Sequence, residues 1–144
     1  KAGRRSFNRL NMKDKYLYFR TEATDANDDA TGDSACWPAS SLVGMQPTAD
    51  SAITLYFKSM VRGSGNEGAG DTLANLDNND TVTLNLTTAN THLAAIKAIA
   101  TNILKTTTPA VIIIANNDSG GTEYLANSGI ASCGTITVQV AYAN

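Results

Sequence analysis

Two stretches of this sequence alternate strictly between apolar and polar residues, which is the pattern of a β-strand that buries one face. They cover residues 52–60 and 81–87. The apolar positions, spaced two residues apart, are Ile53, Leu55 and Phe57 in the first stretch and Val82, Leu84 and Leu86 in the second. Strands of this kind bury their apolar face only within a sheet, so the fold must contain one.

The sequence predicts one helix, from about Thr91 to Lys105. Asn90 or Thr91 can supply the N-cap oxygen, Lys105 complements the negative C-terminal dipole, and Pro109 prevents continuation. Apolar residues recur three and four positions apart and form a stripe of Leu93, Ile96, Ile99, Ala100, Ile103 and Leu104.

Three further segments indicate strands. The aromatic run Lys15–Arg20 is typical of a short strand. The continuous apolar run Ala110–Ala115 predicts a central strand that is covered on both faces. Thr135–Val140 alternates again, whereas Pro38 and Pro47 allow at most an edge strand between them.

We therefore predict an α+β fold, with a mostly antiparallel sheet of about five or six strands and one amphipathic helix packed on it. Residues 14–144 form a single structural domain, and residues 1–13 form an extended basic arm. The strand at 81–87, the helix and the strand at 110–115 would form a β–α–β crossover if the two strands were parallel in one sheet.

The net charge of −2 conceals a strong asymmetry along the chain. Residues 1–20 hold seven of the eleven basic residues and one acid, Asp14, so this stretch carries +6 (seven minus one). The next stretch, residues 22–33, holds five acids and no base. A basic arm beside an acidic loop indicates contact with another chain or with nucleic acid.

Three interpretations of the arm remain open at this stage. It neutralises phosphates, it reaches an acidic protein partner, or it is a solvated tail. We favour the protein partner, do not expect nucleic acid, and regard other copies of the same chain as the main partner. Tyrosine and arginine are enriched at interfaces. The predicted partner-binding residues are Arg4, Arg5, Arg9, Lys13, Tyr16, Tyr18 and Phe19, although core packing is the ordinary role for part of the aromatic set.

Few residues could carry catalysis. His92 is the only histidine, and Cys36 and Cys133 are the only cysteines. Neither cysteine lies in a recognisable nucleophile motif, and we expect two free, mostly buried thiols. A small cysteine hydrolase that pairs one thiol with His92 is the weakest alternative, so we predict no catalytic residue and no enzymatic activity.

Two sequence patterns resemble ligand sites without completing them. Gly63–Gly68 matches a dinucleotide-binding glycine pattern, but the polar residues that follow do not predict a helix. Asp25, Asn27 and Asp29 alternate as in a calcium loop, but Ala30 and Cys36 stand where glycine and glutamate are needed. We predict no cofactor and no metal. No apolar run reaches the roughly 18–20 residues of a membrane helix, so no membrane partner is expected.

Several stretches together resemble small virion structural proteins of marine tailed phages, especially those that infect cyanobacteria. The likeness covers most of the chain beyond the arm, in Lys15–Arg20, Pro38–Thr48, Ile53–Lys58 and Thr81–Ile114. It implies a capsid decoration or cement subunit, or another head-associated subunit, located in the virion and bound to a major capsid or other virion protein. The alternative is a subunit of a self-assembling extracellular filament, in which the N-terminal arm adds a strand to a neighbour.

Overall fold

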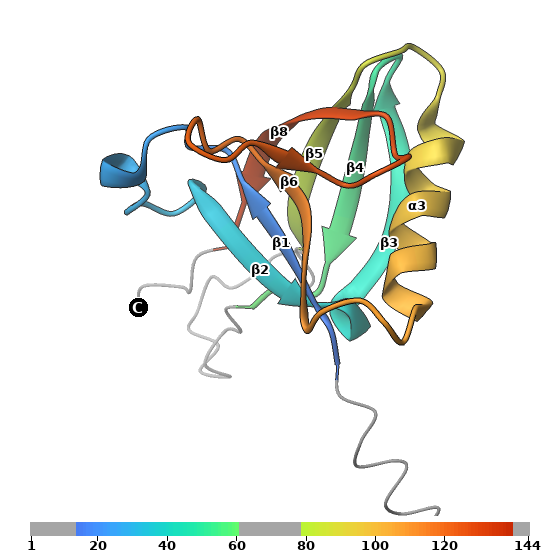
Figure 1. Cartoon of the computed structure of the whole chain (residues 1–144), viewed down its shortest axis with the longest axis horizontal. Helices are drawn as coiled ribbons and strands as arrows, with labels where there is room; N and C mark the ends of the chain where they lie inside the picture. Colours follow the sequence, from blue (N-terminus) through green and yellow to red (C-terminus); the bar gives the residue numbers. More distant parts are fainter. Residues whose placement is uncertain (1–13, 61–78, 140–144) are drawn as a thin grey trace, which may run out of the picture.

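The computed structural model describes residues 14–60 and 79–139 (Figure 1). In this part of the chain eight strands form two four-stranded sheets, accompanied by one α-helix, α3 (His92–Leu104). Sheet A has the order β2 (Ser34–Pro38), β1 (Tyr16–Arg20), β6 (Val111–Asn116) and β7 (Glu123–Tyr124). Sheet B has the order β3 (Leu42–Ala49), β4 (Ala52–Phe57), β5 (Asp80–Leu86) and β8 (Ile130–Thr137).

The α+β class and the mostly antiparallel pairing are confirmed. Every strand pair is antiparallel except β1 with β6, which is parallel. The strands are divided between two sheets, whereas the sequence predicted one. The chain changes sheets at the short 3₁₀ turn η2 (Ala39–Ser41), which leads directly from β2 of sheet A into β3 of sheet B.

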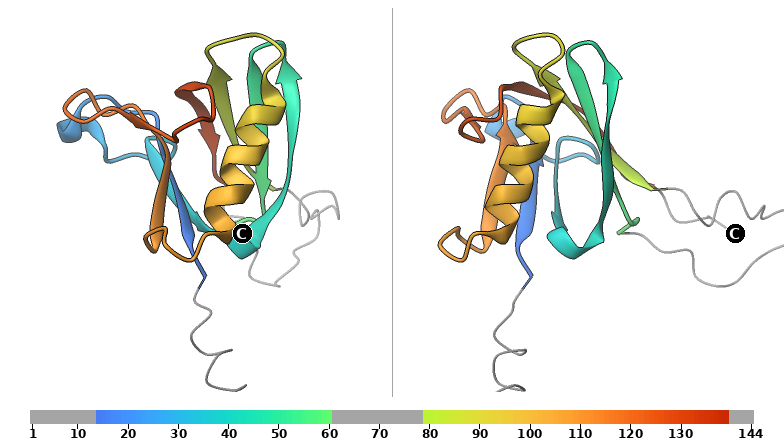
Figure 2. Two further views of the ribbon diagram at one scale, coloured as in Figure 1. Left: turned by 45° about the vertical axis from the view of Figure 1, so that its right-hand side comes forward. Right: turned by 90° about the vertical axis from the view of Figure 1, so that its right-hand side faces the viewer.

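The predicted β–α–β crossover does not form. β5 belongs to sheet B and β6 to sheet A, so α3 connects the two sheets instead of two parallel neighbours in one sheet. The helix packs against β3 and β6, one strand from each sheet. Figure 2 shows the two sheets facing each other, with α3 along one side of the opening between them.

The helix differs from the prediction in its cap and in its buried stripe. Thr91 is the N-cap residue but makes no capping hydrogen bond, because its hydroxyl donates to the Thr88 carbonyl at 2.7 Å. Ala95 and Ile99 are buried, whereas Leu93 and Leu104 are 61% and 81% exposed. Ile96 and Ile103 are partly buried against the core, so only the outermost stripe residues, Leu93 and Leu104, face solvent.

The core lies between the sheets and is supplied by alternate residues of the strands. Ile53, Leu55 and Phe57 of β4 are fully buried, as the alternation predicts. Val82, Leu84 and Leu86 of β5 are buried as well, and Leu17, Phe19, Trp37, Ile112 and Ile114 close the core from sheet A.

Three strand predictions need comment. Pro38 ends edge strand β2, and Pro47 lies in edge strand β3, as expected from their missing N–H donors. β8 begins at Ile130, five residues before the start of the strand predicted at Thr135–Val140. β6 lies inside sheet A, but Val111 is 48% exposed, so the predicted burial on both faces does not hold within one chain.

Gly134 is required by the close approach of β5 and β8. A Cβ atom at this position would lie 2.7 Å from the Thr83 carbonyl oxygen, closer than real Cβ contacts allow. Two register irregularities in the β5–β8 ladder accompany this close approach.

Three aromatic rings hold the two sheets together at one end of the core. Trp37 of β2 stacks on Phe57 of β4, with ring centroids 4.7 Å apart and planes at 7°. Phe19 of β1 meets both rings edge-on, at 5.8 Å and 5.9 Å. Aromatic pairs of this kind contribute about 0.5–1.5 kcal/mol each beyond their buried area.

A buried carboxyl group completes this junction. Asp80, at the start of β5, is fully buried and accepts a hydrogen bond from the Trp37 indole N–H at 2.9 Å. Its two oxygens also accept the backbone N–H groups of Met60 and Gln139, both at 2.8 Å. The Asp80 side chain therefore connects β2 to Met60, which follows β4, and to Gln139, which follows β8.

Candidate functional site

The outer face of sheet A carries an apolar patch that residues 14–60 and 79–139 leave partly exposed. Tyr16 and Tyr18 of β1 point away from the core, because the alternate residues Leu17 and Phe19 point into it. The Cα partners of the two tyrosines are Pro38 and Cys36 on β2, and Val111 and Ile113 on β6. We call this set of six residues the tyrosine face.

Two side chains of the tyrosine face are largely open to solvent. Tyr16 is 43% exposed and Val111 is 48% exposed. Tyr18 and Ile113, one step further along the two strands, are half-buried. None of these four side chains packs against the core cluster, so the face is a separate surface.

Of the predicted partner-binding aromatics, Tyr16 and Tyr18 lie on this surface and Phe19 does not. Phe19 is fully buried between Trp37 and Phe57, so its inclusion among the partner-binding residues was wrong. The reason is the strand period: Phe19 follows Tyr18 and therefore points to the opposite face. Arg4, Arg5, Arg9 and Lys13 lie outside the described residues.

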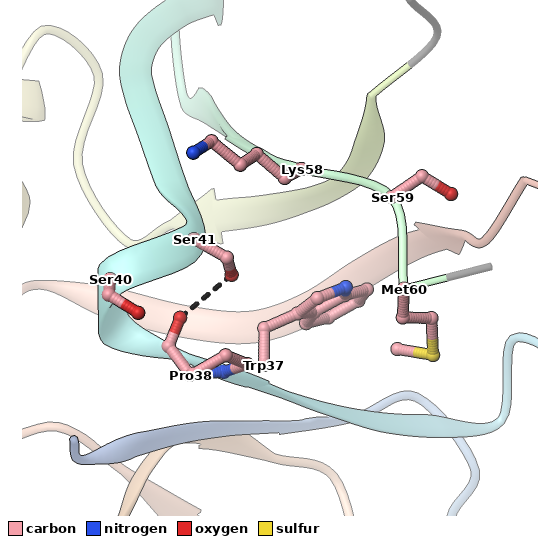
Figure 3. A pocket seen from close by; sticks show the side chains of 7 residues that line it. All are labelled: Trp37, Pro38, Ser40, Ser41, Lys58, Ser59 and Met60. Atoms are coloured by element: carbon pink, nitrogen blue, oxygen red, sulfur yellow. Dashed lines mark hydrogen bonds between the residues drawn. The ribbon is translucent and has the colours of Figure 1, made fainter. Parts of the chain in front are cut away.

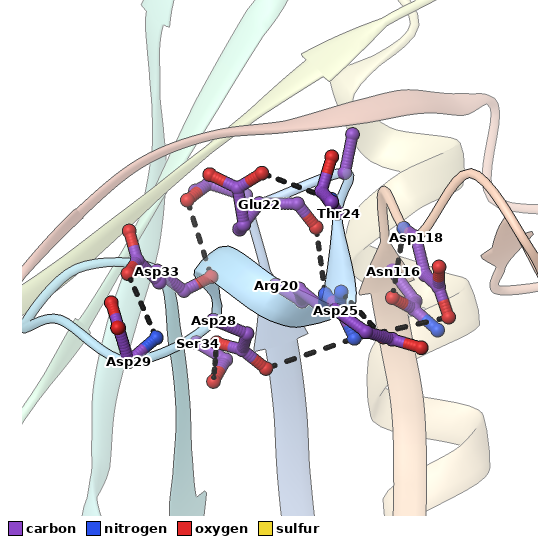
Figure 4. Close-up of polar contacts among 12 residues, drawn as sticks. Arg20, Glu22, Thr24, Asp25, Asp28, Asp29, Asp33, Ser34, Asn116 and Asp118 are labelled. Carbon is purple, nitrogen blue, oxygen red and sulfur yellow. Dashed lines mark hydrogen bonds and ion pairs between the residues drawn. The ribbon is translucent and has the colours of Figure 1, made fainter.

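Arg20 continues the outward series of β1, but its side chain is covered. It is 8% exposed, because the loop after β1 folds back over it. Its guanidinium donates to the Glu22 carbonyl at 2.6 Å and to Asp25 at 2.9 Å, and it lies 3.7 Å from Asp28 and 3.8 Å from Asp118 (Figure 4). The hydrogen bond to Asp25 raises the pKa of Arg20, and the nearby carboxylates act in the same direction.

The acidic loop is held in shape by its own carboxyl groups. Asp33 accepts the backbone N–H groups of Asp29 and Ala30, and Asp28 accepts the hydroxyl of Ser34 at 2.7 Å. Asp25, the first residue of the calcium-like spacing, pairs with Arg20 at 2.9 Å. Residues 14–60 and 79–139 contain no group of three or more His, Cys, Asp or Glu side chains that could hold a metal.

This end of the molecule keeps a large negative excess. Seven of the described acids lie there with the guanidinium of Arg20, which leaves a formal charge of −6 (one minus seven) among these residues. Asp25 is 83% exposed even while it pairs with Arg20. We call this region the acidic end; its acids are Glu22, Asp25, Asp28, Asp29, Asp33, Asp118 and Glu123.

The opposite end of the tyrosine face is where the basic arm joins the domain. The Lys15 ammonium donates to the Lys105 carbonyl and to the Thr108 hydroxyl, and so ties the start of β1 to the turn after α3. β1 and β6 are parallel, so both strands begin at this end and both finish at the acidic end. The tyrosine face therefore has a basic end and an acidic end.

A cavity of about 300 Å³ lies where β2 and η2 meet the end of β4 (Figure 3). Its lining is Trp37, Pro38, Ser40, Ser41, Lys58, Ser59 and Met60. Its size is at the lower limit of small-molecule sites. The lining contains one cation and three hydroxyls but no carboxylate or imidazole, so it lacks an acid–base pair.

The three residues of the hydrolase hypothesis are not brought together. The His92 Nε2–H donates to the carbonyl oxygens of Ala49 and Ala52, at 2.8 Å and 3.1 Å, and this holds its ring at the β3–β4 turn. Cys36 lies on the outer face of sheet A and Cys133 in the core, both as free thiols. Burial raises the pKa of both thiols, to about 12 for Cys133, whereas a nucleophilic cysteine needs a lowered pKa.

A labelling experiment tests this description of the thiols. With a Cys133 pKa of about 12, its thiolate fraction at pH 8 is about one in ten thousand, against roughly one in four for a free thiol. We expect iodoacetamide to modify Cys36 in the folded protein and to leave Cys133 unmodified until the chain is denatured, as read by peptide mass spectrometry. Native labelling of Cys133 at the rate of Cys36 would contradict this description.

Comparisons of the chain with protein-family models, with curated proteins and with solved structures gave no match. The function is therefore argued from the residues and their geometry. In the described part of the chain, no helix is long and apolar enough to cross a membrane.

Sequence reasoning missed several members of the surface. Val111 and Ile113 were assigned to a strand buried on both sides, and Cys36 and Pro38 were not assigned to a surface. Asp118 was placed in a loop without a role. The signal for the first two was present: their alternation with Ile112 and Ile114 puts them on one face, and only strand pairing shows that this face is the outer one.

Proposed function

We propose that this protein is a non-enzymatic structural subunit that acts by assembling with other copies of itself and with a larger protein lattice. The observation that carries the proposal is the tyrosine face, an exposed apolar surface on a parallel strand pair. Exposed apolar patches of this kind are candidate interaction sites, and the tyrosines add residues that are enriched at protein interfaces.

The virion is the setting that the sequence favours. The resemblance to small virion structural proteins of marine tailed phages supports a decoration, cement or other head-associated role. A decoration subunit binds a repeated surface at high local concentration, so modest contacts of the arm and the tyrosine face add up through avidity. Its activity is binding energy, and a major capsid protein or another virion protein is the expected lattice partner.

The placement of the reactive side chains also supports an assembly role. The thiol with the most strongly raised pKa is buried, His92 is engaged by two backbone carbonyls, and the cavity beside Trp37 has no acid–base pair. Catalysis by these residues would need them in mutual contact. Binding through a surface with oppositely charged ends does not require contact between these reactive side chains.

Deletion of residues 1–13 tests the proposal. We expect the truncated chain to keep its fold, because the described core begins at Leu17. We expect its self-association to weaken by at least tenfold, because five of the eleven basic residues of the chain are removed. Circular dichroism measures the fold, and sedimentation velocity measures association.

The control is a full-length chain in which all five basic residues of the arm are changed to glutamine: Lys1, Arg4, Arg5, Arg9 and Lys13. It keeps the length of the arm and should associate as weakly as the truncation. Normal association of both variants would contradict a role for the arm.

A further inference from the structure

β6 carries an apolar run that its own chain covers on one side only. Val111–Ala115 reads Val-Ile-Ile-Ile-Ala, which is typical of a parallel strand buried on both faces. Ile112 and Ile114 meet the core, but Val111 and Ile113 meet water. The parallel pair β1–β6 is thus half covered, and its open side is the tyrosine face.

The charges around the tyrosine face identify what can cover it. Lys15 and the point where the arm joins the domain lie at one end, and the acidic end lies at the other, about five residues or roughly 17 Å away along β1. A partner must bring an apolar surface with acids at one end and bases at the other. A second copy of this chain in the reverse direction has this combination.

We propose that the tyrosine faces of two copies pack against each other with their β1 strands antiparallel. This inference rests on the proposed assembly function. The two-fold axis lies between the faces and runs across the strands. A two-fold axis along the strands would instead set basic end against basic end and acidic end against acidic end. Only the crossing axis places the basic end of each copy on the acidic end of the other.

The area of the patch explains why the arm is part of the interface. Three strands about 17 Å long and about 4.8 Å apart present roughly 250 Å², whereas stable interfaces bury about 800 Å² on each partner. The arm of thirteen residues spans up to about 43 Å when extended. It can therefore cross to the partner's acidic end, where the exposed Asp25 carboxylate offers a charge contact.

Substitutions of opposite charge at one exposed position test the direction of packing. Val111 lies at the basic end and faces the partner's acidic end, so Val111→Glu adds repulsion and Val111→Lys adds attraction. We expect sedimentation velocity to show at least a tenfold loss of self-association for Val111→Glu and a clearly smaller loss for Val111→Lys. Leu93→Glu and Leu93→Lys are the controls, because Leu93 is 61% exposed on α3, away from this face.

Cys36 provides a second, independent readout. It is the Cα partner of Tyr18, in the middle of the face, so the crossing axis sets the two Cys36 residues opposite each other. Facing sheets lie about 10 Å apart, so a short bismaleimide should join two copies through Cys36 in a Cys133→Ser chain. A chain whose single cysteine is Leu93→Cys, with Cys36→Ser and Cys133→Ser, should remain uncoupled.

The outcomes separate this inference from the proposed function. Charge-dependent loss at Val111 together with coupling at Cys36 supports the antiparallel pair. If the full chain associates but the Val111 and Leu93 variants behave alike and Cys36 does not couple, the inference is wrong and assembly proceeds through another surface. If the full chain neither self-associates nor binds another protein, the proposed function fails as well.

Discussion

Asp80→Ala should lower the free energy of unfolding by about 3 kcal/mol, because it removes the only acceptor from a buried indole N–H and from two backbone N–H groups. An unsatisfied buried donor costs about 1–3 kcal/mol, and Met60 and Gln139 recover part of theirs from water. A domain of this size is stable by about 5–15 kcal/mol. The loss is therefore a large fraction of the total and is measured by urea unfolding.

Two variants make the result interpretable. Asp80→Asn keeps the volume and one acceptor oxygen but presents an NH₂ group to an N–H donor. It should therefore lower the free energy of unfolding by a measurable amount, but by less than Asp80→Ala. Asp29→Ala removes an exposed carboxyl group and should change stability by at most about 0.5 kcal/mol. Equal unfolding midpoints for Asp80→Ala and the unmodified chain would show that the carboxyl group does not connect the sheets.

Trp37→Ala should have a comparable or larger effect, a loss of about 3–5 kcal/mol. The indole is 1% exposed, stacks on Phe57 at 4.7 Å and donates its N–H to Asp80, so truncation leaves a cavity and removes one of the hydrogen bonds to the buried carboxyl group. Trp37→Phe keeps a ring and should lose less. Urea unfolding of the three chains gives the order.

A double-mutant cycle separates the hydrogen bond of Trp37 from its packing. If the indole N–H and Asp80 act as a unit, the costs of Trp37→Phe and Asp80→Asn should sum to more than the cost of the double variant. Strictly additive costs would contradict a direct interaction. Tyr16→Ala, on the outer face of the same sheet, is the control for loss of an aromatic ring that does not contact the core.

The segments with a clean period of two were predictable because nothing interrupts their alternation. Val82, Leu84 and Leu86 all face the core, as their spacing requires. β8 was missed at its start because its buried residues Ile130, Cys133 and Ile136 are three apart. Register irregularities against β5 change which residues face inward, and those irregularities depend on the partner strand.

The division into two sheets had no local signal. It depends on the chain turning at η2, between Pro38 and Leu42, and on α3 spanning from sheet B to sheet A. Neither event changes the periodicity of a strand. The sequence therefore indicated the strand content and the class of the fold but not which strands pair.

The candidate surface was half predictable. Tyr16 and Tyr18 were selected from residue type and from their position after the arm. The covering of Arg20 by Asp25, Asp28 and Asp118 was not, because Asp118 is 98 positions away in sequence (118 minus 20) and reaches Arg20 only through the parallel pairing of β1 and β6. The role of Asp80 was also not predictable, because in the sequence it resembles its polar neighbours and only its burial in the fold distinguishes it from them.

The surface and the fold support one account. The aromatic junction and Asp80 hold the two sheets together, and this rigid pair of sheets presents the tyrosine face between a basic and an acidic end. Under the proposed function, a protein organised in this way acts by what it binds. Its behaviour should therefore depend on its own concentration and on salt, which screens the charged ends.

The mass of the full-length chain in solution, measured by sedimentation from micromolar to millimolar concentration, tests this account most directly. We predict a mass that rises with concentration from the 15.1 kDa of one chain to at least twice that value, and falls back when salt is added. A mass of 15.1 kDa at every concentration, with no binding to any virion protein, would contradict it.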